Sequence, residues 1–143
     1  MNYLVATDGS EEADEAVRYA ARQALAFDCT LHIGHVLTPE TELVDGEIVF
    51  PGGEQAIEKG ERTLNQAKRL ATDLADQRDS TLDIETQLLS GRPADSITEY
   101  ADEIDAGAIY VGHRGLSEKQ EQITGSVAKS IVDKASMPVT IVR

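Results

Sequence analysis

The sequence predicts a single doubly wound α/β domain over residues 1–143, with a five-stranded parallel sheet and four helices. Two observations carry this prediction. Strand-length apolar runs alternate with amphipathic helical patterns along the chain, which is typical of βαβ units with right-handed crossovers and helices on both faces of the sheet. In addition, 143 residues with 41% hydrophobic content suit one domain with one sizeable core.

The first two strand and helix units come from the N-terminal half. The apolar run NYLVA predicts a strand at Asn2–Ala6, and Thr7-Asp8-Gly9-Ser10 separates it from a helical pattern at 13–25. A second apolar run at Thr30–Leu37 and an amphipathic segment at 57–74 repeat this order. The polar stretch between them carries Asp45-Gly46, which is a hairpin signal. This stretch is long for a connection, so both a surface excursion and a lid that touches a ligand are open interpretations.

The last three strands follow the same alternation. Residues 82–89 alternate as a half-exposed strand does, so we expect them at a sheet edge. Gly91-Arg92-Pro93 introduces a helix with Pro93 in its first turn, where proline fits, and its inward residues are Ile97, Tyr100, Ala101 and Ile104. The remaining elements are a buried strand at 108–111, a helix at 127–135 and a strand at 138–142. Ligands bind such sheets beyond the carboxyl ends of the strands, so we expect Asp8 and Gly112 to face one crevice.

A glycine motif, Gly112-x2-Gly115-x9-Gly125-Ser126, connects the fourth strand to the last helix. Glycine has no Cβ and tolerates positive φ, so a phosphate can approach the main chain at Gly112 and Gly115. Gly125 and Ser126 then begin a helix, whose first amides suit an anion. The spacing therefore indicates a phosphate cradle and nucleotide binding. The alternative is that the glycines only end a strand, turn the chain and begin a helix.

These residues resemble the universal stress protein family, specifically its ATP-binding branch. The similarity covers essentially the whole chain: the first strand with Thr7-Asp8-Gly9-Ser10, the Gly91-Arg92-Pro93 turn, the glycine motif without insertion, and the ending Pro-Val-Thr-Ile-Val. The resemblance implies an adenine nucleotide alpha hydrolase-like fold with strand order 3-2-1-4-5. It also implies ATP as the ligand, with Mg²⁺ held mainly by phosphate oxygens and water rather than by protein ligands.

The resemblance further implies a role for each matching residue. Asp8 and Val36 would lie at the adenosine end, with Ala6 and Thr7 lining the base pocket. The ribose and phosphates would contact the glycine motif, and the amides at the start of the last helix would hold the outer phosphates. The residues implied at this phosphate end are Gly112, His113, Arg114, Gly115, Gly125, Ser126 and Val127.

Several of these residues have a second interpretation. Asp8 follows a strand and precedes a helix, so it could cap that helix or its turn. Val36 would bind through its backbone, and its side chain could simply be core. Ser126 could be an N-cap, a role compatible with touching phosphate. Arg114 offers a fork of donors for phosphate but could equally form a salt bridge, and Lys119 and Lys129 are weaker candidates.

The chain also departs from common family members. The spacer of the motif reads LSEKQEQIT and carries Glu118 and Glu121 where the family is more basic, which lowers the expected affinity. His113 replaces the small hydroxyl residue that family members often have after the first glycine, so the resemblance does not imply the hydroxyl contact to ribose or phosphate at this position. His32 and His35 lie three apart on a strand and point to opposite faces, so they cannot share a metal. We expect packing or hydrogen-bonding roles for them, and core packing for the single cysteine, Cys29.

The net charge of −13, from 26 acidic and 13 basic residues, disfavours nucleic acid and anionic membranes as partners. We expect a cytoplasmic protein, because neither a signal peptide nor a membrane span is recognisable. A halophilic origin is a hypothesis that reconciles this charge with an anionic ligand, since about 1 M salt shortens the Debye length to roughly 3 Å.

The leading functional prediction is a nucleotide-binding stress or regulatory protein with little or no turnover of ATP. No P-loop, kinase or nucleophile-elbow motif is present, and His113 is the one side chain in the cradle suited to acid or base work. The alternatives are a slow ATPase or phosphotransfer enzyme, and a dimeric adaptor with a vestigial pocket. We expect a homodimer through strand 138–142, because an unpaired apolar edge is a hazard. The sequence does not reveal a downstream partner.

Overall fold

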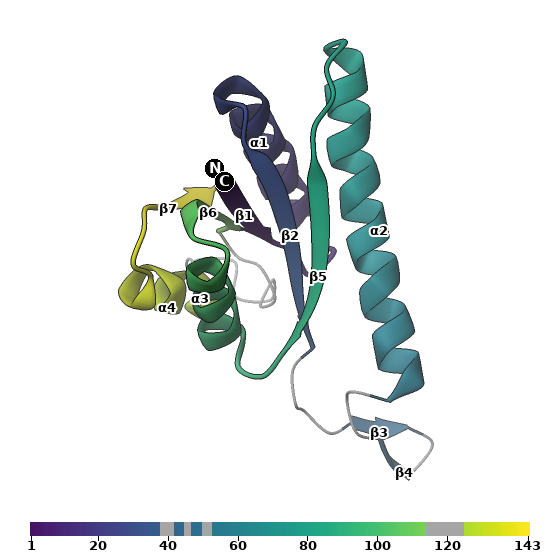
Figure 1. Ribbon diagram of the computed structural model, residues 1–143. Helices are drawn as coiled ribbons and strands as arrows, with labels where there is room; N and C mark the ends of the chain where they lie inside the picture. Colours follow the sequence, from purple (N-terminus) through teal and green to yellow (C-terminus); the bar gives the residue numbers. More distant parts are fainter. Residues whose placement is uncertain (38–41, 45–46, 50–52, 114–124) are drawn as a thin grey trace.

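The computed structural model describes residues 1–37, 42–44, 47–49, 53–113 and 125–143 (Figure 1). Five parallel strands form a twisted sheet in the order β5-β2-β1-β6-β7. In chain order they are β1 (Asn2–Ala6), β2 (Thr30–Leu37), β5 (Ile84–Ser90), β6 (Ala106–Gly112) and β7 (Val139–Val142). The predicted strand order 3-2-1-4-5 is confirmed, as is the edge position of β5. β6 is longer than predicted at both ends, and β5 begins two residues later.

Four helices cover the two faces of the sheet, as predicted (Figure 1). One face packs against α1 (Glu11–Phe27) and α2 (Glu54–Gln77), and the other against α3 (Pro93–Glu103) and α4 (Ser126–Lys134). Each face has its own core of buried aliphatic residues, and β1 contributes Val5 to one and Leu4 to the other. β1 is thus buried on both faces at the centre of the molecule, as expected for a central parallel strand.

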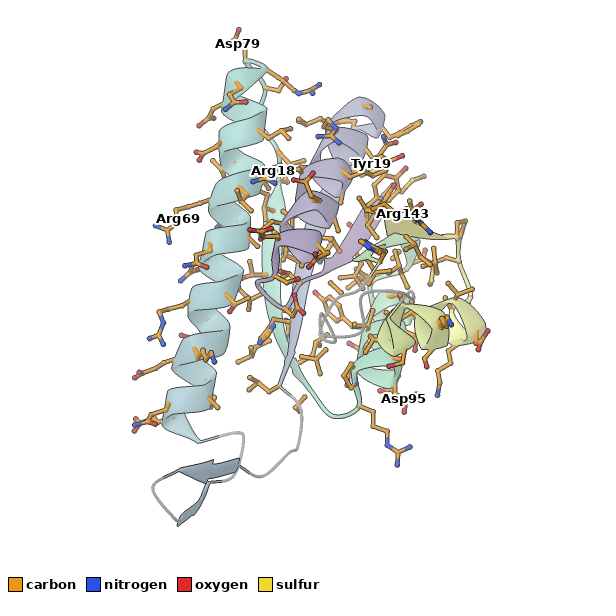
Figure 2. The ribbon with its side chains drawn as sticks, turned by 180° about the vertical axis from the view of Figure 1, so that it is seen from behind. Arg18, Tyr19, Arg69, Asp79, Asp95 and Arg143 are labelled. Atoms are coloured by element: carbon orange, nitrogen blue, oxygen red, sulfur yellow. The ribbon has the colours of Figure 1, made fainter. Side chains whose placement is uncertain are left out.

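The helix ends follow from local sequence. Ser10 is the N-cap of α1, and its hydroxyl accepts from the amide of Ala13 at 3.2 Å. Asp28 ends α1 in the left-handed conformation. Pro93 occupies the first turn of α3, as predicted. The charged residues of α2 are exposed, and the side chain of Arg69 points away from the sheet (Figure 2).

A short hairpin precedes α2. β3 (Glu42–Val44) and β4 (Glu47–Val49) pair antiparallel with the register Val44↔Glu47, which confirms the hairpin signal. Its turn residues, Asp45-Gly46, lie outside the described residues. No helix in the described part of the chain is long and apolar enough to cross a membrane.

The two strand histidines point to opposite faces, as predicted. The ring of His32 lies 3.1 Å from the hydroxyl of Tyr100 in α3, measured from Nδ1. His35 instead bonds to the carbonyl of Thr7 and packs beside Gly60 in α2. Cys29 is buried, in agreement with a packing role. Within the described ranges, no three His, Cys, Asp or Glu residues are grouped to hold a metal ion.

Candidate functional site

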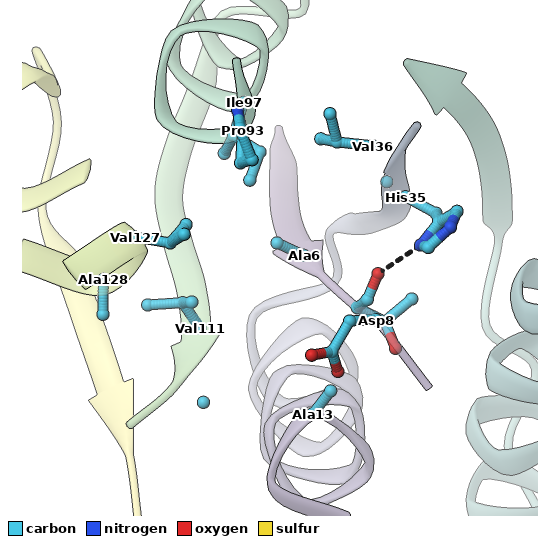
Figure 3. A pocket seen from close by; sticks show the side chains of 13 residues that line it. Ala6, Asp8, Ala13, His35, Val36, Pro93, Ile97, Val111, Val127 and Ala128 are labelled. Carbon is cyan, nitrogen blue, oxygen red and sulfur yellow. Dashed lines mark hydrogen bonds between the residues drawn. The ribbon is translucent and has the colours of Figure 1, made fainter. Parts of the chain in front are cut away.

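A pocket of about 500 Å³, counted with its open mouth, lies at the carboxyl ends of β1, β2 and β6 (Figure 3). β1 lies between β2 and β6, so this is the point at which the strand order reverses. The pocket is lined by Ala6, Thr7, Asp8, Ala13, Gly34, His35, Val36, Pro93, Ile97, Val111, Gly112, Val127 and Ala128. The expectation that Asp8 and Gly112 share one crevice is confirmed.

One side of the pocket is apolar. Val36 at the end of β2 and Ala6 at the end of β1 face Pro93 and Ile97 from α3 (Figure 3). Val127 adds a further branched side chain from the first turn of α4. A slot lined in this way suits a flat, largely apolar ring system that carries a few polar groups at its edge.

The chain leaves β1 through a set of local hydrogen bonds. The amide of Thr7 donates to Gly34 at 2.9 Å and extends the pairing of β1 with β2 by one bond. The carbonyl oxygen of Thr7 then accepts from Nδ1 of His35 at 2.8 Å. The Thr7 hydroxyl accepts from the amide of Gly9 at 3.1 Å. Thr7 is buried, and both its carbonyl oxygen and its hydroxyl oxygen accept hydrogen bonds beside the pocket.

These bonds change the surroundings of Val36. In a parallel ladder, alternate residues turn both their N–H and their C=O toward the same neighbouring strand. If the pairing of β1 with β2 continued, the N–H of Val36 would donate to the carbonyl of Thr7, and the C=O of Val36 would accept from the amide of Gly9. That carbonyl and that amide bond instead to the His35 ring and the Thr7 hydroxyl. Among the described residues, the main-chain groups of Val36 on the β1 side have no partner. One donor and one acceptor therefore face the pocket.

Asp8 shows the turn-capping role that the sequence left open. Its Oδ1 accepts from the amide of Ser10 at 2.9 Å, whereas Ser10, not Asp8, caps α1. No described residue bonds to its other carboxylate oxygen. Asp8 lines the pocket with its carboxylate directed inward from the end of β1 (Figure 3). Turn capping thus leaves an acceptor available to a ligand.

The start of α4 lies across the pocket from Asp8. Gly125 is its N-cap, and no side chain in the described part of the chain caps its first turn, so the alternative of Ser126 as N-cap is wrong. Ser126 is the first helical residue and is exposed. The amide of Gly125 donates to the carbonyl of His113 at 2.6 Å, so Ser126 and Val127 carry the first amides of the helix that remain for an anion.

Gly112 is required by a contact within the fold, and it does not have the positive φ that the sequence allowed for. It is the last residue of β6, and among the described glycines positive φ occurs at Gly9 and Gly91, not at Gly112. A Cβ at this position would lie 2.8 Å from the carbonyl oxygen of Glu12. The absence of a side chain is therefore required by the first turn of α1, although Gly112 also lines the pocket.

The remaining residues predicted to contact phosphate are not among the described residues of the pocket wall. Arg114 and Gly115 lie outside the described residues, as do Glu118, Lys119 and Glu121 of the spacer. His113 is half-buried and lies not in the pocket wall but in an adjoining hollow. That hollow is lined by Glu11, Glu12, Asp14, Glu15, Arg18, His113 and Arg143.

Sequence reasoning missed half of the pocket wall. Pro93, Ile97 and Ala128 come from helix faces whose apolar pattern is the same for core and for pocket. His35 was assigned only packing or hydrogen bonding. Its position, one residue before Val36 near the end of a strand, could have indicated a place beside the pocket. Its hydrogen-bond acceptor, the carbonyl of Thr7, was not predictable, because that depends on where the pairing of β1 with β2 ends.

The fold and the position of the pocket define a class: doubly wound α/β proteins with a pocket at the strand switch point, where such sheets commonly hold ligands. Within it, the chain belongs to the universal stress protein family, whose sequence profile matches residues 1–143. A curated Staphylococcus aureus (strain USA300) protein named for the same family is 35% identical over 147 residues, covering 99% of this chain and 83% of the relative.

Solved structures of family members agree. A universal stress protein from Archaeoglobus fulgidus superposes with a TM-score of 0.75 at 29% identity, covering 100% of this chain and 93% of that one. A universal stress protein in complex with cAMP gives 0.76 at 26% identity, with coverage of 100% and 97%. An Archaeoglobus fulgidus family protein in complex with dAMP gives 0.74 at 27% identity, with coverage of 100% and 98%. The last two of these structures hold adenine nucleotides, cAMP in one and dAMP in the other.

Proposed function

We propose that this protein binds ATP in the pocket at the end of β1 and acts as a nucleotide-dependent stress-response or regulatory protein with little or no turnover. The observation that carries the proposal is the convergence of three groups on one apolar slot. These are the main-chain donor and acceptor of Val36, the Asp8 carboxylate, and the start of α4, which no described side chain caps. Relatives of this fold hold cAMP and dAMP.

Each part of ATP finds a complementary group in this arrangement. The edge of adenine offers a donor amino group beside an acceptor nitrogen, which matches the C=O and N–H of Val36. The ribose hydroxyls would donate to the Asp8 carboxylate. The phosphates would lie on the amides of Ser126 and Val127, with the Ser126 hydroxyl as a further donor, because a helix N-terminus carries partial positive charge.

The pocket also fits a Mg²⁺ that the nucleotide carries on its phosphates. Mg²⁺ keeps several waters and binds phosphate oxygens in preference to a protein cage. Among the described residues, Asp8 is the one acidic side chain in the pocket wall, and it is a candidate for contact with the metal through water. Mg²⁺ would partly neutralise the phosphates and so reduce their repulsion by the net negative charge of the protein.

Slow turnover agrees with the chemistry of the lining. Among the described residues, the pocket wall holds one histidine, His35, and its Nδ1 is bonded to Thr7. Of the residues that the structure describes at the start of α4, none has a side chain suited to activate a water. An ATPase or phosphotransfer role would need a group from the spacer or a partner, and it is tested by multiple-turnover ADP release from wild type and Ser126→Ala. The other alternative, a dimeric adaptor with a vestigial pocket, predicts no binding at all.

The binding test is a calorimetric titration of Mg-ATP in molar KCl, with Asp8→Asn and the control Asp28→Asn. Both variants remove one negative charge, but Asp28 follows α1 and precedes β2, so it lies at the amino ends of the strands, opposite the pocket at their carboxyl ends. Loss of a charge-assisted hydrogen bond is expected to weaken ATP binding by roughly 10- to 100-fold in Asp8→Asn. Asp28→Asn should bind like wild type. Absence of binding by the folded wild type would favour the adaptor.

Two further properties belong to the proposal. We infer a cytoplasmic homodimer in which β7, the edge of the sheet, pairs with its copy. We also infer that the net charge of −13 suits a saline interior, where close amide contacts survive while distant carboxylates are screened. Denaturation in dilute buffer and in molar KCl tests the second inference, and equal stability in both would contradict it.

A further inference from the structure

We propose that His35 and the hydroxyl of Thr7 are positioning residues that hold the β1–β2 ladder open, so that the main chain of Val36 can read the adenine edge. This inference rests on the proposed function, because it concerns how the same pocket selects its base. Neither side chain needs to touch the nucleotide. Each binds a main-chain group that would otherwise bond to Val36.

The register of the two strands locates this effect. β1 and β2 pair from Asn2↔Thr30 to Ala6↔Gly34, and the amide of Thr7 still donates to Gly34. β2 continues to Leu37, because its other edge pairs with β5 as far as Leu37↔Ser90. Val36 is therefore held in extended conformation by β5 while β1 turns away. A main-chain donor and acceptor remain on its β1 side, at the pocket.

His35 supplies a specific hydrogen at this point. A carbonyl oxygen can only accept, so the 2.8 Å contact to Thr7 requires a hydrogen on Nδ1. The ring edge packs against α2, where a Cβ on Gly60 would lie 3.2 Å from Cδ2 of His35. The ring is thus held between a helix and the carbonyl that it binds, which fixes its orientation.

Thr7 completes the arrangement through its hydroxyl. The amide of Gly9, which would donate to Val36 in a continued ladder, donates to Thr7 Oγ1 at 3.1 Å. Gly9 has φ +82, a conformation that turns the chain toward α1. The His35 bond therefore occupies the carbonyl to which the N–H of Val36 would donate. The Thr7 hydroxyl occupies the amide from which the C=O of Val36 would accept.

The consequence is selection of the base. Adenine presents a donor and an acceptor to Val36, whereas hypoxanthine, with a carbonyl at position 6 and a hydrogen on N1, presents them in reverse order. Wild type is therefore expected to prefer ATP over inosine triphosphate (ITP) on the order of 10-fold to 100-fold, because the reversed edge leaves polar groups unpaired. Closing the ladder onto Val36 would remove this preference.

The experiment compares ATP and ITP affinities of wild type, His35→Phe, His35→Asn and His32→Phe. Phenylalanine keeps the ring but has no donor, so His35→Phe should lose most of the preference for ATP. The amide of asparagine can donate from nearly the Nδ1 position, so His35→Asn should retain the preference. His32→Phe is the control, because it makes the same replacement on the same strand but at the histidine that faces α3. It should keep the preference for ATP over ITP even if it lowers the stability of the fold.

Amide hydrogen exchange of the ligand-free wild type adds a readout that does not depend on a variant folding. The Val36 amide should exchange faster than those of Ile33 and Gly34, which lie inside the paired register, and ATP should protect it. ¹⁵N spectra should show hydrogen on Nδ1 of His35. A protected Val36 amide in the ligand-free protein would overturn the inference. So would equal affinity of wild type for ATP and ITP, or an unchanged preference in folded His35→Phe, while ATP binding itself stands. If wild type binds no nucleotide, the proposed function fails as well.

Discussion

A Cβ on Gly112 would lie 2.8 Å from the carbonyl oxygen of Glu12 and 2.9 Å from its carbonyl carbon. The end of β6 is thus in direct contact with the main chain of the first turn of α1. Because these atoms are backbone, they cannot move aside without shifting the helix. Gly112 and Ala13 both line the pocket, so this contact also fixes one corner of the candidate site.

The first prediction concerns stability at this contact. Gly112→Ala should lower the free energy of unfolding by about 1–3 kcal/mol, the usual cost of overpacking a rigid site. Gly107→Ala is the matched control, because Gly107 is exposed in the same strand and its Cβ would meet Met1 Sδ at an ordinary 3.4 Å. That variant should be neutral or more stable by roughly 0.5–1 kcal/mol, since glycine costs more entropy than alanine. Urea denaturation of both measures the difference.

Gly112 shows where sequence reasoning reached its limit. The motif identified it as a special position, and it does line the pocket. The predicted reason, close approach of phosphate, could not be separated from close approach of a helix, because the sequence does not show which backbone lies beside β6. If Gly112→Ala proved as stable as wild type, the contact with α1 would not be a constraint.

The second prediction is a pH effect from His32. This side chain is 5% exposed, and its Nδ1 lies 3.1 Å from the Tyr100 hydroxyl. Burial lowers the pKa of His32 below the usual 6.5, and the charge of Glu85 opposes this shift only in part. Between the folded pKa and 6.5 the unfolded chain binds more protons than the folded one. The stability that neutral His32 contributes is therefore present above pH 6.5 and is lost as pH falls through the folded pKa.

Urea denaturation at about pH 7.5 and about pH 5.5 tests this sign. Wild type should lose more stability on acidification than His32→Gln, which keeps a polar side chain but does not titrate. The carboxylates contribute to both proteins alike, so the difference between the two losses isolates His32. An equal loss in both proteins would show that His32 does not control stability in this pH range.

The third prediction concerns a bridge between the two helices of one face. Lys134 Nζ lies 2.5 Å from Asp95 Oδ1 and joins the last turn of α4 to the first turn of α3. The hydrogen bond from Lys134, together with its charge, holds the pKa of Asp95 below the ordinary 3.8. Both side chains are well exposed, so salt should screen the pair strongly.

A double-mutant cycle with Asp95→Asn and Lys134→Gln measures this coupling by denaturation. A small favourable coupling is expected in dilute buffer near neutral pH, and none in molar KCl. Its contribution should also disappear as pH falls through the lowered pKa of Asp95. Coupling that persists in molar salt would mean that the pair contributes by fixing helix packing rather than by charge.

The fold was largely predictable because its signals are local. Alternating apolar runs and amphipathic segments predicted five strands and four helices, and the polar alternation of residues 82–89 placed the third strand, β5, at an edge. Asp8 was predicted from its place after a strand. Two features depended on tertiary contacts and were not predictable. The bond from His35 to Thr7 requires knowledge of where β1 leaves β2, and the bond from Gly125 to His113 joins residues on either side of the spacer.

The last prediction tests the proposed dimer through the geometry of β7. The amide of Ile109 donates to Pro138 and that of His113 donates to Val142, so alternate residues of this strand face β6. By the same alternation, Val139 and Ile141 turn their main-chain groups to the open edge of the sheet.

Ile141→Pro removes one N–H from that edge without removing a bond to β6, and proline is tolerated on edge strands. Light scattering in molar KCl should give twice 15.5 kDa for wild type and for the control Ile141→Val, and 15.5 kDa for Ile141→Pro. Circular dichroism should confirm that the proline variant is folded. A monomeric wild type would contradict the dimer, whereas a folded Ile141→Pro that stays dimeric would show that the two copies associate through another surface.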